Sequence, residues 1–247
     1  MTDNPQNTLP MSTDAQQAYD RMRQAAQLHR ERNIQVKRER LIEPSGLGKR
    51  FADATFDEYL TENQQQAHAL EACRRFAGNF TKVLELGSNL VMLGNTGTGK
   101  TMLAACILTT IIRAGHTGKY HTVQTLIREF RSSWGKDSKT SEREMLAGLA
   151  NLDLLIVDEV GVQYGTDAEK VALFEVINAR YEAMKPTILI SNLMTRQDGT
   201  PGPCIEDSMG DRIIDRLRHN GLFLGFNWQS KRCQSGKQAN NKEIIDK

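Results

Sequence analysis

Three glycines with a closing lysine–threonine pair, all within eight residues, constrain the fold of this chain more than any other feature. The segment reads Gly94-Asn95-Thr96-Gly97-Thr98-Gly99-Lys100-Thr101, follows the apolar run LVML, and continues from Met102 into an apolar helical segment. This G-x-x-x-x-G-K-T spacing between a strand and a helix predicts a P-loop, whose backbone amides point at phosphate oxygens. A chance glycine-rich turn is the competing interpretation, and the complete context favours the P-loop.

Several residues of the P-loop have an expected role. The glycines let the backbone turn tightly, and the start of the following helix adds partial positive charge. We expect residues 94–102 to bind ATP, Lys100 to reach its β- and γ-phosphates, and the Thr101 hydroxyl to bind Mg²⁺.

A second motif, LLIVDE, covers residues 154–159. Four aliphatic residues end in two acids, at the carboxyl end of a strand where parallel α/β sheets bind ligands. It resembles a Walker B motif. We expect Asp158 to hold Mg²⁺, directly or through water, and Glu159 to polarise the attacking water. A strand that simply leaves the core into a polar turn is the alternative.

A third apolar strand, residues 188–190, ends in Ser191 and Asn192. Its place in the series makes Asn192 a candidate sensor 1 residue, which contacts the γ-phosphate or the attacking water. An ordinary asparagine in a turn is the competing interpretation.

Late arginines form a fourth group: Arg212, Arg216 and Arg218 in GDRIIDRLRHN, and Arg232 in FNWQSKR. Positions 212 and 216 share a helix face. A permanently charged guanidinium suits the γ-phosphate of ATP bound to a neighbouring subunit. A local ion-pair network with Asp211 and Asp215 is the alternative.

Apolar runs alternate with helical segments from Phe51 onward. We expect strands over residues 89–93, 120–123, 152–157, 187–191 and 222–226, and helices over residues 63–80, 101–114, 125–134, 142–150, 166–184 and 209–218. Glycine- or polar-rich loops are expected at 135–141 and 197–203. This alternation predicts an α/β fold with a mostly parallel sheet flanked by helices.

The length of 247 residues suits one α/β domain with a short appendage. We expect a disordered tail at 1–15, a basic helical extension with a linker at 16–50, an ATPase domain at 51–233 and a polar tail at 234–247. Within 16–42, cations outnumber acids. That segment is either a solvated helix or a docking helix for a partner or nucleic acid.

Composition excludes several classes of protein. The net charge is only +2, so any nucleic-acid binding must come from local patches. No C-x-x-C pair occurs among Cys73, Cys106, Cys204 and Cys233, which argues for reduced thiols and against a zinc site. The first residues are polar and lack the apolar region of a signal peptide, and the longest apolar runs are too short to span a membrane. We therefore expect a soluble cytoplasmic protein.

Taken in chain order, these motifs resemble the AAA+ ATPases. The resemblance runs from about residue 51 to residue 232 and is carried by FADATFDEYL, GNTGTGKT, LDLLIVDEVG, KPTILISN, GDRIIDRLR and FNWQSKR. Within that superfamily, the chain is similar to the DnaC-type helicase-loader family, which includes the transposition helper ATPase IstB. The last two segments favour the loader branch.

The resemblance implies further roles. Arg216 matches the arginine finger, with Arg212 as a second candidate, and Arg232 matches the sensor 2 arginine. Family members self-associate through ATP bound between subunits, and turnover is slow until a neighbour supplies the finger. The N-terminal extension would grip a replicative hexameric DNA helicase, which is loaded onto single-stranded DNA.

Basic and aromatic residues between the Walker motifs could contact that DNA: Lys119, Tyr120, His121, Arg128, Phe130, Arg131, Trp134 and Lys136. Those at helical spacing, Phe130 among them, could equally belong to the core.

Two other functions stay open. One is an IstB-like transposition helper that acts on duplex DNA. The other is a small-molecule P-loop kinase, which Asp158, Glu159 and Asn192 fit poorly.

Overall fold

The computed structural model describes residues 45–133, 141–161, 167–196 and 202–230, and all of residues 16–27 except 18, 20 and 26. Side chains in the third range are described from residue 170. Contacts divide the chain into two units, Met1–Leu41 and Ile42–Lys247, so residues 45–50 belong to the larger unit. The described residues of the smaller unit are helical and exposed. The expected tails and most of the two expected loops lie outside the described residues.

The larger unit is built on five parallel strands: β1 (Leu90–Gly94), β2 (Gly118–Thr122), β3 (Leu154–Val160), β4 (Thr187–Ser191) and β5 (Leu222–Phe226). Their order across the sheet is β2-β3-β4-β1-β5. The expected α/β class with a parallel sheet is confirmed. Because β4 lies between β1 and β3, the carboxyl ends of these three strands meet at one edge of the sheet.

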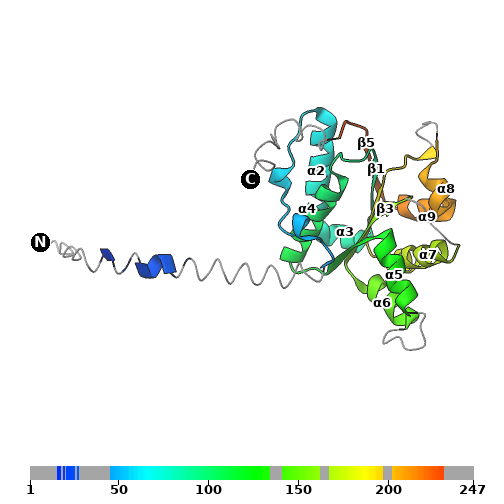
Figure 1. Ribbon diagram of the computed structural model, residues 1–247, viewed down its shortest axis with the longest axis horizontal. Coiled ribbons are helices and arrows are strands. Elements are labelled where there is room, and N and C mark those ends of the chain that lie inside the picture. Colours follow the sequence, from blue (N-terminus) through cyan, green and yellow to red (C-terminus); the bar gives the residue numbers. More distant parts are fainter. Residues whose placement is uncertain are drawn as a thin grey trace, which may run out of the picture. The chain divides into compact units, whose positions relative to one another are not determined.

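Helices cover both faces of the sheet (Figure 1). One face packs against α2 (Gln64–Gly78), α3 (Phe80–Leu86) and α4 (Lys100–Arg113). The other packs against α5 (Val123–Ser133), α6 (Glu142–Asn151), α7 (Asp167–Glu182), α8 (Ile205–Met209) and α9 (Asp211–Arg218). Alternate strand residues point to opposite faces, so Leu90 and Met92 join the first core while Val91 and Leu93 join the second.

The structure differs from the expected elements at a few positions. The helix expected over 63–80 is two helices, because Asn79 leaves the helical conformation (φ −107°, ψ 28°) and α3 starts after it. The helix α8 and two 3₁₀ turns, Lys49–Phe51 and Phe56–Glu58, are additional. The strand β3 runs three residues beyond its expected end, for a reason given below.

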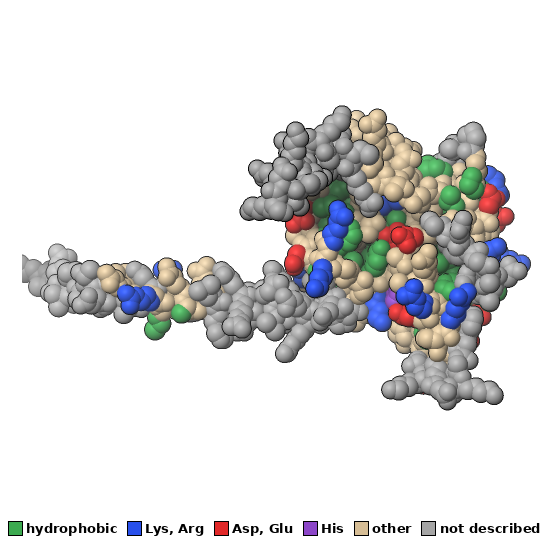
Figure 2. Space-filling view, viewed as in Figure 1, with side chains coloured by type: hydrophobic (Ala, Val, Ile, Leu, Met, Phe, Trp, Pro, Cys, Tyr) green, Lys and Arg blue, Asp and Glu red, His purple; other side chains and the backbone are tan. Residues whose placement is uncertain are grey.

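Basic and acidic side chains are interspersed over the face of the molecule in Figure 2, which agrees with the small net charge. Cys73, Cys106 and Cys204 are buried free thiols, as expected, and burial raises the pKa of Cys106 to about 12. No helix in the described part of the chain combines the length and apolarity that a membrane crossing requires. No cluster of three or more metal-ligating side chains occurs among the described His, Cys, Asp and Glu residues.

Candidate nucleotide-binding site

The P-loop connects β1 to α4. The strand ends at Gly94 and the helix begins at Lys100, so the sequence-predicted loop lies between a buried strand and a buried helix. The Lys100 side chain is 5% exposed, and its ammonium donates to the carbonyl oxygens of Gly94 (2.6 Å) and Asn95 (2.7 Å). The loop therefore curls around a buried cation, which is the group expected to attract phosphate.

Two glycines of the loop leave no room for a side chain. The backbone of Gly94 (φ 123°) lies so close to β5 that a Cβ would fall 2.5 Å from the carbonyl oxygen of Phe226. A Cβ on Gly99 (φ 98°) would fall 2.5 Å from the ring of Tyr59. Both positions also have the positive φ that favours glycine. Close packing on two sides thus fixes the path of the loop.

The carbonyl oxygen of Thr98 is held from both sides of the P-loop. It accepts hydrogen bonds from the Tyr59 hydroxyl (3.0 Å) and from the indole N–H of Trp228 (3.1 Å). Both side chains are buried. Burial raises the pKa of Tyr59, so its hydroxyl stays protonated and remains a donor. The N-terminal flank and the end of β5 therefore position the loop together.

A β-bulge at the end of β3 aims the two acids of the second motif. Val157 pairs with Leu189 and Val160 with Ser191, so three steps along β3 match two along β4. Such an extra residue bends a strand and redirects its side chains, and it lets pairing continue to Val160. Glu159 in the bulge has φ 60°, which is strained for a non-glycine residue, and its side chain is exposed.

The Asp158 carboxylate is 5% exposed and accepts three hydrogen bonds. Its Oδ2 accepts from the Thr101 hydroxyl (2.7 Å) and the Tyr120 hydroxyl (2.9 Å), and its Oδ1 accepts from the Glu159 amide (2.6 Å). The two residues expected to hold the metal ion, Thr101 and Asp158, are therefore in direct contact. Burial and the nearby Asp158 charge raise the pKa of Tyr120, so its hydroxyl keeps its proton.

Asn192 follows β4 directly, and its side-chain oxygen accepts a hydrogen bond from the Lys100 ammonium at 3.1 Å. The position of β4 between β1 and β3 explains this contact, because it sets Asn192 between the P-loop and the acids of β3. The three motifs predicted from separate parts of the sequence thus form one site.

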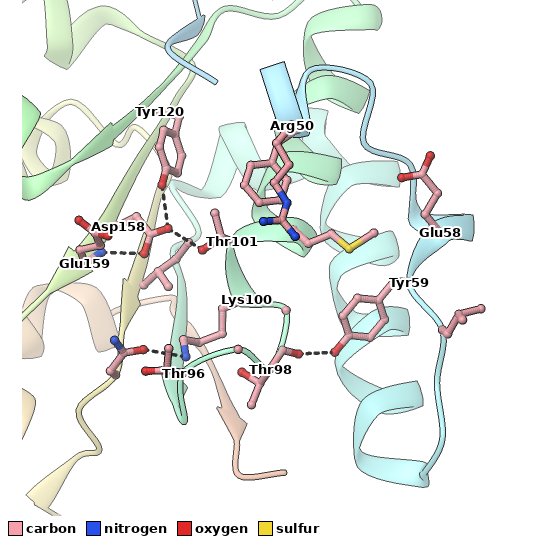
Figure 3. A pocket seen from close by; sticks show the side chains of 17 residues that line it. Arg50, Glu58, Tyr59, Thr96, Thr98, Lys100, Thr101, Tyr120, Asp158 and Glu159 are labelled. Atoms are coloured by element: carbon pink, nitrogen blue, oxygen red, sulfur yellow. Dashed lines mark hydrogen bonds between the residues drawn. The ribbon is translucent and has the colours of Figure 1, made fainter. Parts of the chain in front are cut away.

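A cavity of about 480 Å³ opens at this edge of the sheet. Its lining includes residues 96–102 of the P-loop together with Asp158, Glu159 and Asn192. Gly94 and Asn95 complete the loop without lining the cavity. Figure 3 shows Tyr120, Asp158 and Glu159 on one side of Lys100 and Thr101, and Arg50, Glu58 and Tyr59 on the other.

Several lining residues carry no sequence signal of their own. Arg50, Phe51, Glu58, Tyr59 and Leu60 form the wall contributed by the N-terminal flank. The segment FADATFDEYL marks that flank only through the family resemblance. The basic and aromatic residues around Tyr120 in the sequence suggest a DNA surface, yet Tyr120 lines the cavity and its hydroxyl donates to Asp158.

The late arginines lie elsewhere. Arg216 on α9 is placed over the rings of Phe174 (5.1 Å to the centroid) and Tyr181 (5.7 Å), and neither it nor the exposed Arg212 lines the cavity. Among the described residues, the expected alternative of ion pairs from these two arginines to Asp211 and Asp215 does not occur. Arg232 lies outside the described residues.

The stretch proposed for DNA contact divides in the structure. Phe130, on the inner face of α5, is fully buried in the core, and His121 on β2 is 5% exposed, so neither offers a stacking surface. Arg128 and Arg131 are exposed on α5, and Lys119 is half-buried. Trp134 and Lys136 lie outside the described residues.

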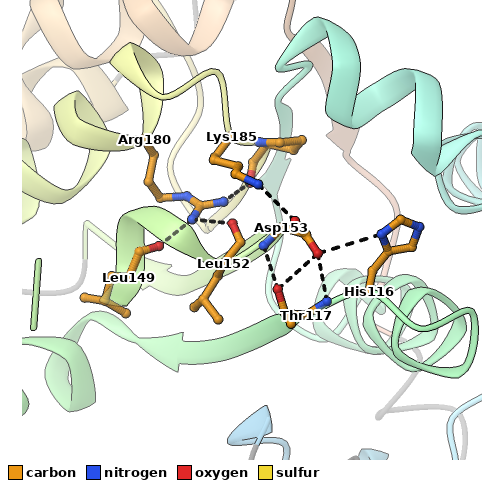
Figure 4. A network of polar contacts seen from close by, with 8 residues as sticks. His116, Thr117, Leu149, Leu152, Asp153, Arg180 and Lys185 are labelled. Carbon is orange, nitrogen blue, oxygen red and sulfur yellow. Dashed lines mark hydrogen bonds and ion pairs between the residues drawn. The ribbon is translucent and has the colours of Figure 1, made fainter. Parts of the chain in front are cut away.

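A second polar network lies at the opposite, amino-terminal ends of the strands (Figure 4). The buried guanidinium of Arg180 donates to the carbonyl oxygens of Leu149, Leu152 and Pro186 and to the Thr187 hydroxyl. Burial lowers the pKa of Arg180 to about 9, which is still high enough for the guanidinium to be charged at neutral pH. It ties the end of α6 to the start of β4 and is a structural element of the sheet.

The P-loop, with the side chains that β3 and β4 bring to it, makes this chain a P-loop nucleotide-binding protein. Comparison with known proteins places it more narrowly. The family model for the IstB-like ATP binding protein matches residues 12–239. The chain belongs to this IstB-like ATP-binding family, and its core has the AAA+ fold.

Similar proteins include replicative helicase loaders. The loader DnaC of Buchnera aphidicola subsp. Baizongia pistaciae is 30% identical over 202 residues, which cover 81% of this chain and 78% of that protein. DnaC of Escherichia coli strain K12 is 30% identical over 216 residues, which cover 87% and 83%. The crystal structure of the DnaC helicase loader matches with a TM-score of 0.63 and 26% identity, covering 73% of this chain and 100% of that one.

A more distant match shows the fold alone. The replication initiator DnaA, in a structure bound to AMPPCP and single-stranded DNA, has a TM-score of 0.59 and 20% identity. It covers 78% of this chain and 58% of that one.

Proposed function

We propose that this protein is an ATP-dependent helicase loader, which delivers a replicative hexameric helicase onto single-stranded DNA. The observation that carries the proposal is the similarity to replicative helicase loaders, 30% identical along 78–83% of their length. The family match begins at residue 12 and so includes the N-terminal extension as well as the ATPase unit. In this proposal, ATP bound between subunits controls assembly and release.

The cavity supports the proposed binding of ATP with Mg²⁺. The Thr101 hydroxyl and the Asp158 carboxylate are hard oxygen donors 2.7 Å apart, and Mg²⁺ is bound by one or two such groups together with nucleotide phosphates. When bound, Mg²⁺ neutralises charge on the β- and γ-phosphates. Residues 94–102 cradle the phosphates, Lys100 turns its ammonium from loop carbonyls to phosphate oxygens, and the adenosine contacts the wall at residues 50–60.

The proposed hydrolysis uses side chains at the ends of β3 and β4. Glu159 polarises the attacking water, since its carboxylate is exposed to the cavity at the bulge. Asn192, which already hydrogen-bonds Lys100, contacts the γ-phosphate or that water. Both groups act at the carboxyl edge of the sheet, where charge develops during phosphoryl transfer.

Completion of the site by a neighbouring subunit is part of the proposal. Arg216 and Arg212 lie on α9, outside the cavity of their own subunit. A guanidinium there can act only on the nucleotide of another copy, which makes self-association a condition of turnover. We retain Arg216 as the finger and Arg212 as the second candidate. Arg232 is proposed as the sensor 2 residue.

The N-terminal extension is proposed to bind the helicase. Tyr19 and Met22, three positions apart on a helix, are 51% and 71% exposed and project on one side. Amphipathic helices bind partner grooves through apolar anchors at this spacing. The arginines at 21 and 23 flank these anchors and are exposed. For single-stranded DNA, the exposed Arg128 and Arg131 remain the candidate contacts.

A second candidate function is a transposition helper ATPase acting on duplex DNA. The matching family model, whose description is IstB-like, favours it. It shares the ATP chemistry and differs in its partner. The small-molecule kinase has no such support.

Co-purification with the replicative helicase of the same cell tests the proposal. The full chain with Mg²⁺ and ATP should form a complex, and changing Tyr19 and Met22 together to Ala should weaken it by about tenfold or more. The control changes Gln17 and Gln24, on the opposite side of the helix, to Ala. No complex with the unaltered chain would exclude the loader function. Assembly on duplex DNA without helicase would favour the IstB-like alternative.

A further inference from the structure

Tyr120 contacts the acidic side of the nucleotide site, although no motif includes it. Its hydroxyl donates to Asp158 Oδ2 at 2.9 Å, and the same oxygen accepts from the Thr101 hydroxyl at 2.7 Å (Figure 3). The other oxygen accepts the Glu159 amide at 2.6 Å. Three donors from three elements therefore fix the carboxylate in one orientation.

The sheet register explains why Tyr120 reaches this carboxylate. Thr122 of β2 pairs with Asp158 of β3, and Tyr120 pairs with Ile156. Residues two apart on a strand share a face, so Tyr120 and Asp158 are diagonal neighbours on the face that carries the cavity. An aromatic side chain spans that diagonal, whereas a shorter hydroxyl residue at 120 would not.

The backbone of Tyr120 is itself held in place. The segment Ser45–Leu47 lies against β2 at Tyr120, with Ser45 and Leu47 both buried. Gly46 has φ 78°, and a Cβ there would overlap the carbonyl oxygen of Tyr120. The backbone at Tyr120 is thus closely packed, although β2 is an edge strand of the sheet.

We propose that Tyr120 is a positioning residue that acts through Asp158 and sets the affinity of the site for the Mg²⁺ bound with ATP. This inference rests on the proposed binding of Mg²⁺ and ATP. Mg²⁺ requires nearly ideal octahedral geometry, so the orientation of the carboxylate that holds it, directly or through water, determines how well it binds. Partners that orient a metal-binding group typically change metal affinity by about 10–100-fold when they are removed.

Nucleotide binding measured with and without Mg²⁺ separates this role from a contribution of Tyr120 to nucleotide binding that does not involve the metal ion. A fluorescent, non-hydrolysable ATP analogue is titrated into the full-length protein in EDTA, and Mg²⁺ is then titrated at a fixed analogue concentration. In Tyr120→Phe, which removes only the hydroxyl, the Mg²⁺ concentration for half-maximal effect should rise about tenfold, while binding in EDTA stays within about twofold. An unchanged Mg²⁺ titration, or equal losses with and without Mg²⁺, would overturn the proposal.

Tyr59 provides the matched comparison. It is a second tyrosine that lines the cavity, but its hydroxyl donates to the Thr98 carbonyl of the P-loop. Tyr59→Phe should therefore weaken analogue binding to a similar extent with and without Mg²⁺. If Tyr59→Phe shifted the Mg²⁺ titration as much as Tyr120→Phe, positioning of Asp158 would not be the cause.

Two further variants test whether the shift in the Mg²⁺ titration comes from the lost hydroxyl and whether it acts through Asp158. Tyr120→Met lacks the donor but packs differently, and it must show the same Mg²⁺ shift. In an Asp158→Asn background, Tyr120→Phe should add little, because residues that act through one another are not additive. Additive shifts would overturn the proposal. Failure of the unaltered protein to bind the analogue at all would instead overturn the proposed ATP function.

Discussion

The ammonium group of Lys100 and the side-chain oxygen of Asn192 lie 3.1 Å apart, although 92 residues separate them in the chain. The contact exists because β4 is inserted between β1 and β3, which sets the residue after β4 beside the P-loop. The same insertion puts Asn192 next to Asp158 and Glu159 in one cavity lining. The site therefore depends on strand order as much as on the motifs themselves.

The two residues of this pair should respond differently to substitution. Lys100→Ala should weaken ATP binding by about 100-fold, since it removes charge-assisted bonds to phosphate. Asn192→Ala should leave ATP binding within about threefold but lower hydrolysis by about 100-fold, as loss of a preorganised polar group does. Equilibrium binding and phosphate release measure the two effects. Asn227→Ala, exposed at the end of β5, is the control. If Asn192→Ala weakened ATP binding as much as Lys100→Ala does, Asn192 would act in ATP binding and not in hydrolysis.

Glu159→Gln should retain binding of ATP and Mg²⁺ and lower hydrolysis by about 10³-fold, because an amide cannot accept the proton of the attacking water. Single-turnover phosphate release with bound-nucleotide analysis measures this. Glu85→Gln, exposed on α3 at the other end of the sheet, should hydrolyse ATP normally. Hydrolysis at the unaltered rate in Glu159→Gln would assign the role of base to another group.

Arg216→Ala should bind ATP normally and lose about 10³-fold of the hydrolysis that assembly stimulates. Loss of its contacts with Phe174 and Tyr181 should cost about 0.5–1 kcal/mol of stability, which a thermal melt detects. Arg212→Ala, one turn earlier and exposed, tests the second candidate.

A subunit-mixing experiment decides whether the arginine acts on a neighbour. Lys100→Ala subunits lack nucleotide but carry Arg216, and Arg216→Ala subunits bind nucleotide but lack the arginine. Mixed assemblies should recover part of the hydrolysis that neither variant shows alone. The absence of any recovery would show that Arg216 does not act between subunits.

Stability should fall as the pH drops from about 7 to 5, in part because of His121. Burial lowers the pKa of His121, and the positive charge of Lys119 lowers it further, while the nearby Glu129 carboxylate has the opposite, smaller effect. Its Nε2 has no hydrogen-bond partner within the described ranges. Below the usual histidine pKa of about 6.5, the unfolded chain binds a proton that the folded chain does not, so the free energy of unfolding decreases.

His121→Phe should remove this contribution. Urea unfolding between pH 5 and 7.5 should then show a shallower acid decline than in the unaltered protein. His68→Asn serves as the matched control, since His68 is exposed on α2. An identical decline in His121→Phe would mean that other groups account for it.

The residues on the sequence motifs were predictable, and those that support them were not. Lys100, Thr101, Asp158, Glu159 and Asn192 come together as their strand-end positions indicate, because parallel strands end at one edge. Tyr59 and Trp228, which hold the Thr98 carbonyl, act through distances of 39 and 130 residues along the chain. Such contacts have no local pattern, and only the folded chain reveals them.

Periodicity also could not predict backbone detail. An apolar run gives the strand β3, yet the bulge that extends it to Val160 depends on pairing with β4. The misassigned Tyr120 shows the same limit. Its position among basic and aromatic residues suggested a DNA surface, while the β2–β3 register directs its hydroxyl to Asp158.

The positive φ of Glu159 has a consequence for how this chain responds to selection. A non-glycine residue in the left-handed region, such as Glu159, destabilises the fold by about 1–2 kcal/mol. Replacement by glycine removes this strain, but the greater conformational entropy of glycine in the unfolded chain offsets about half of the stabilisation. Glu159→Gly should therefore stabilise the fold slightly while removing the proposed base. A library screened for heat resistance alone would enrich glycine at 159, and one screened for ATP turnover would eliminate it. At position 159, thermal stability therefore favours glycine, whereas ATP hydrolysis favours glutamate.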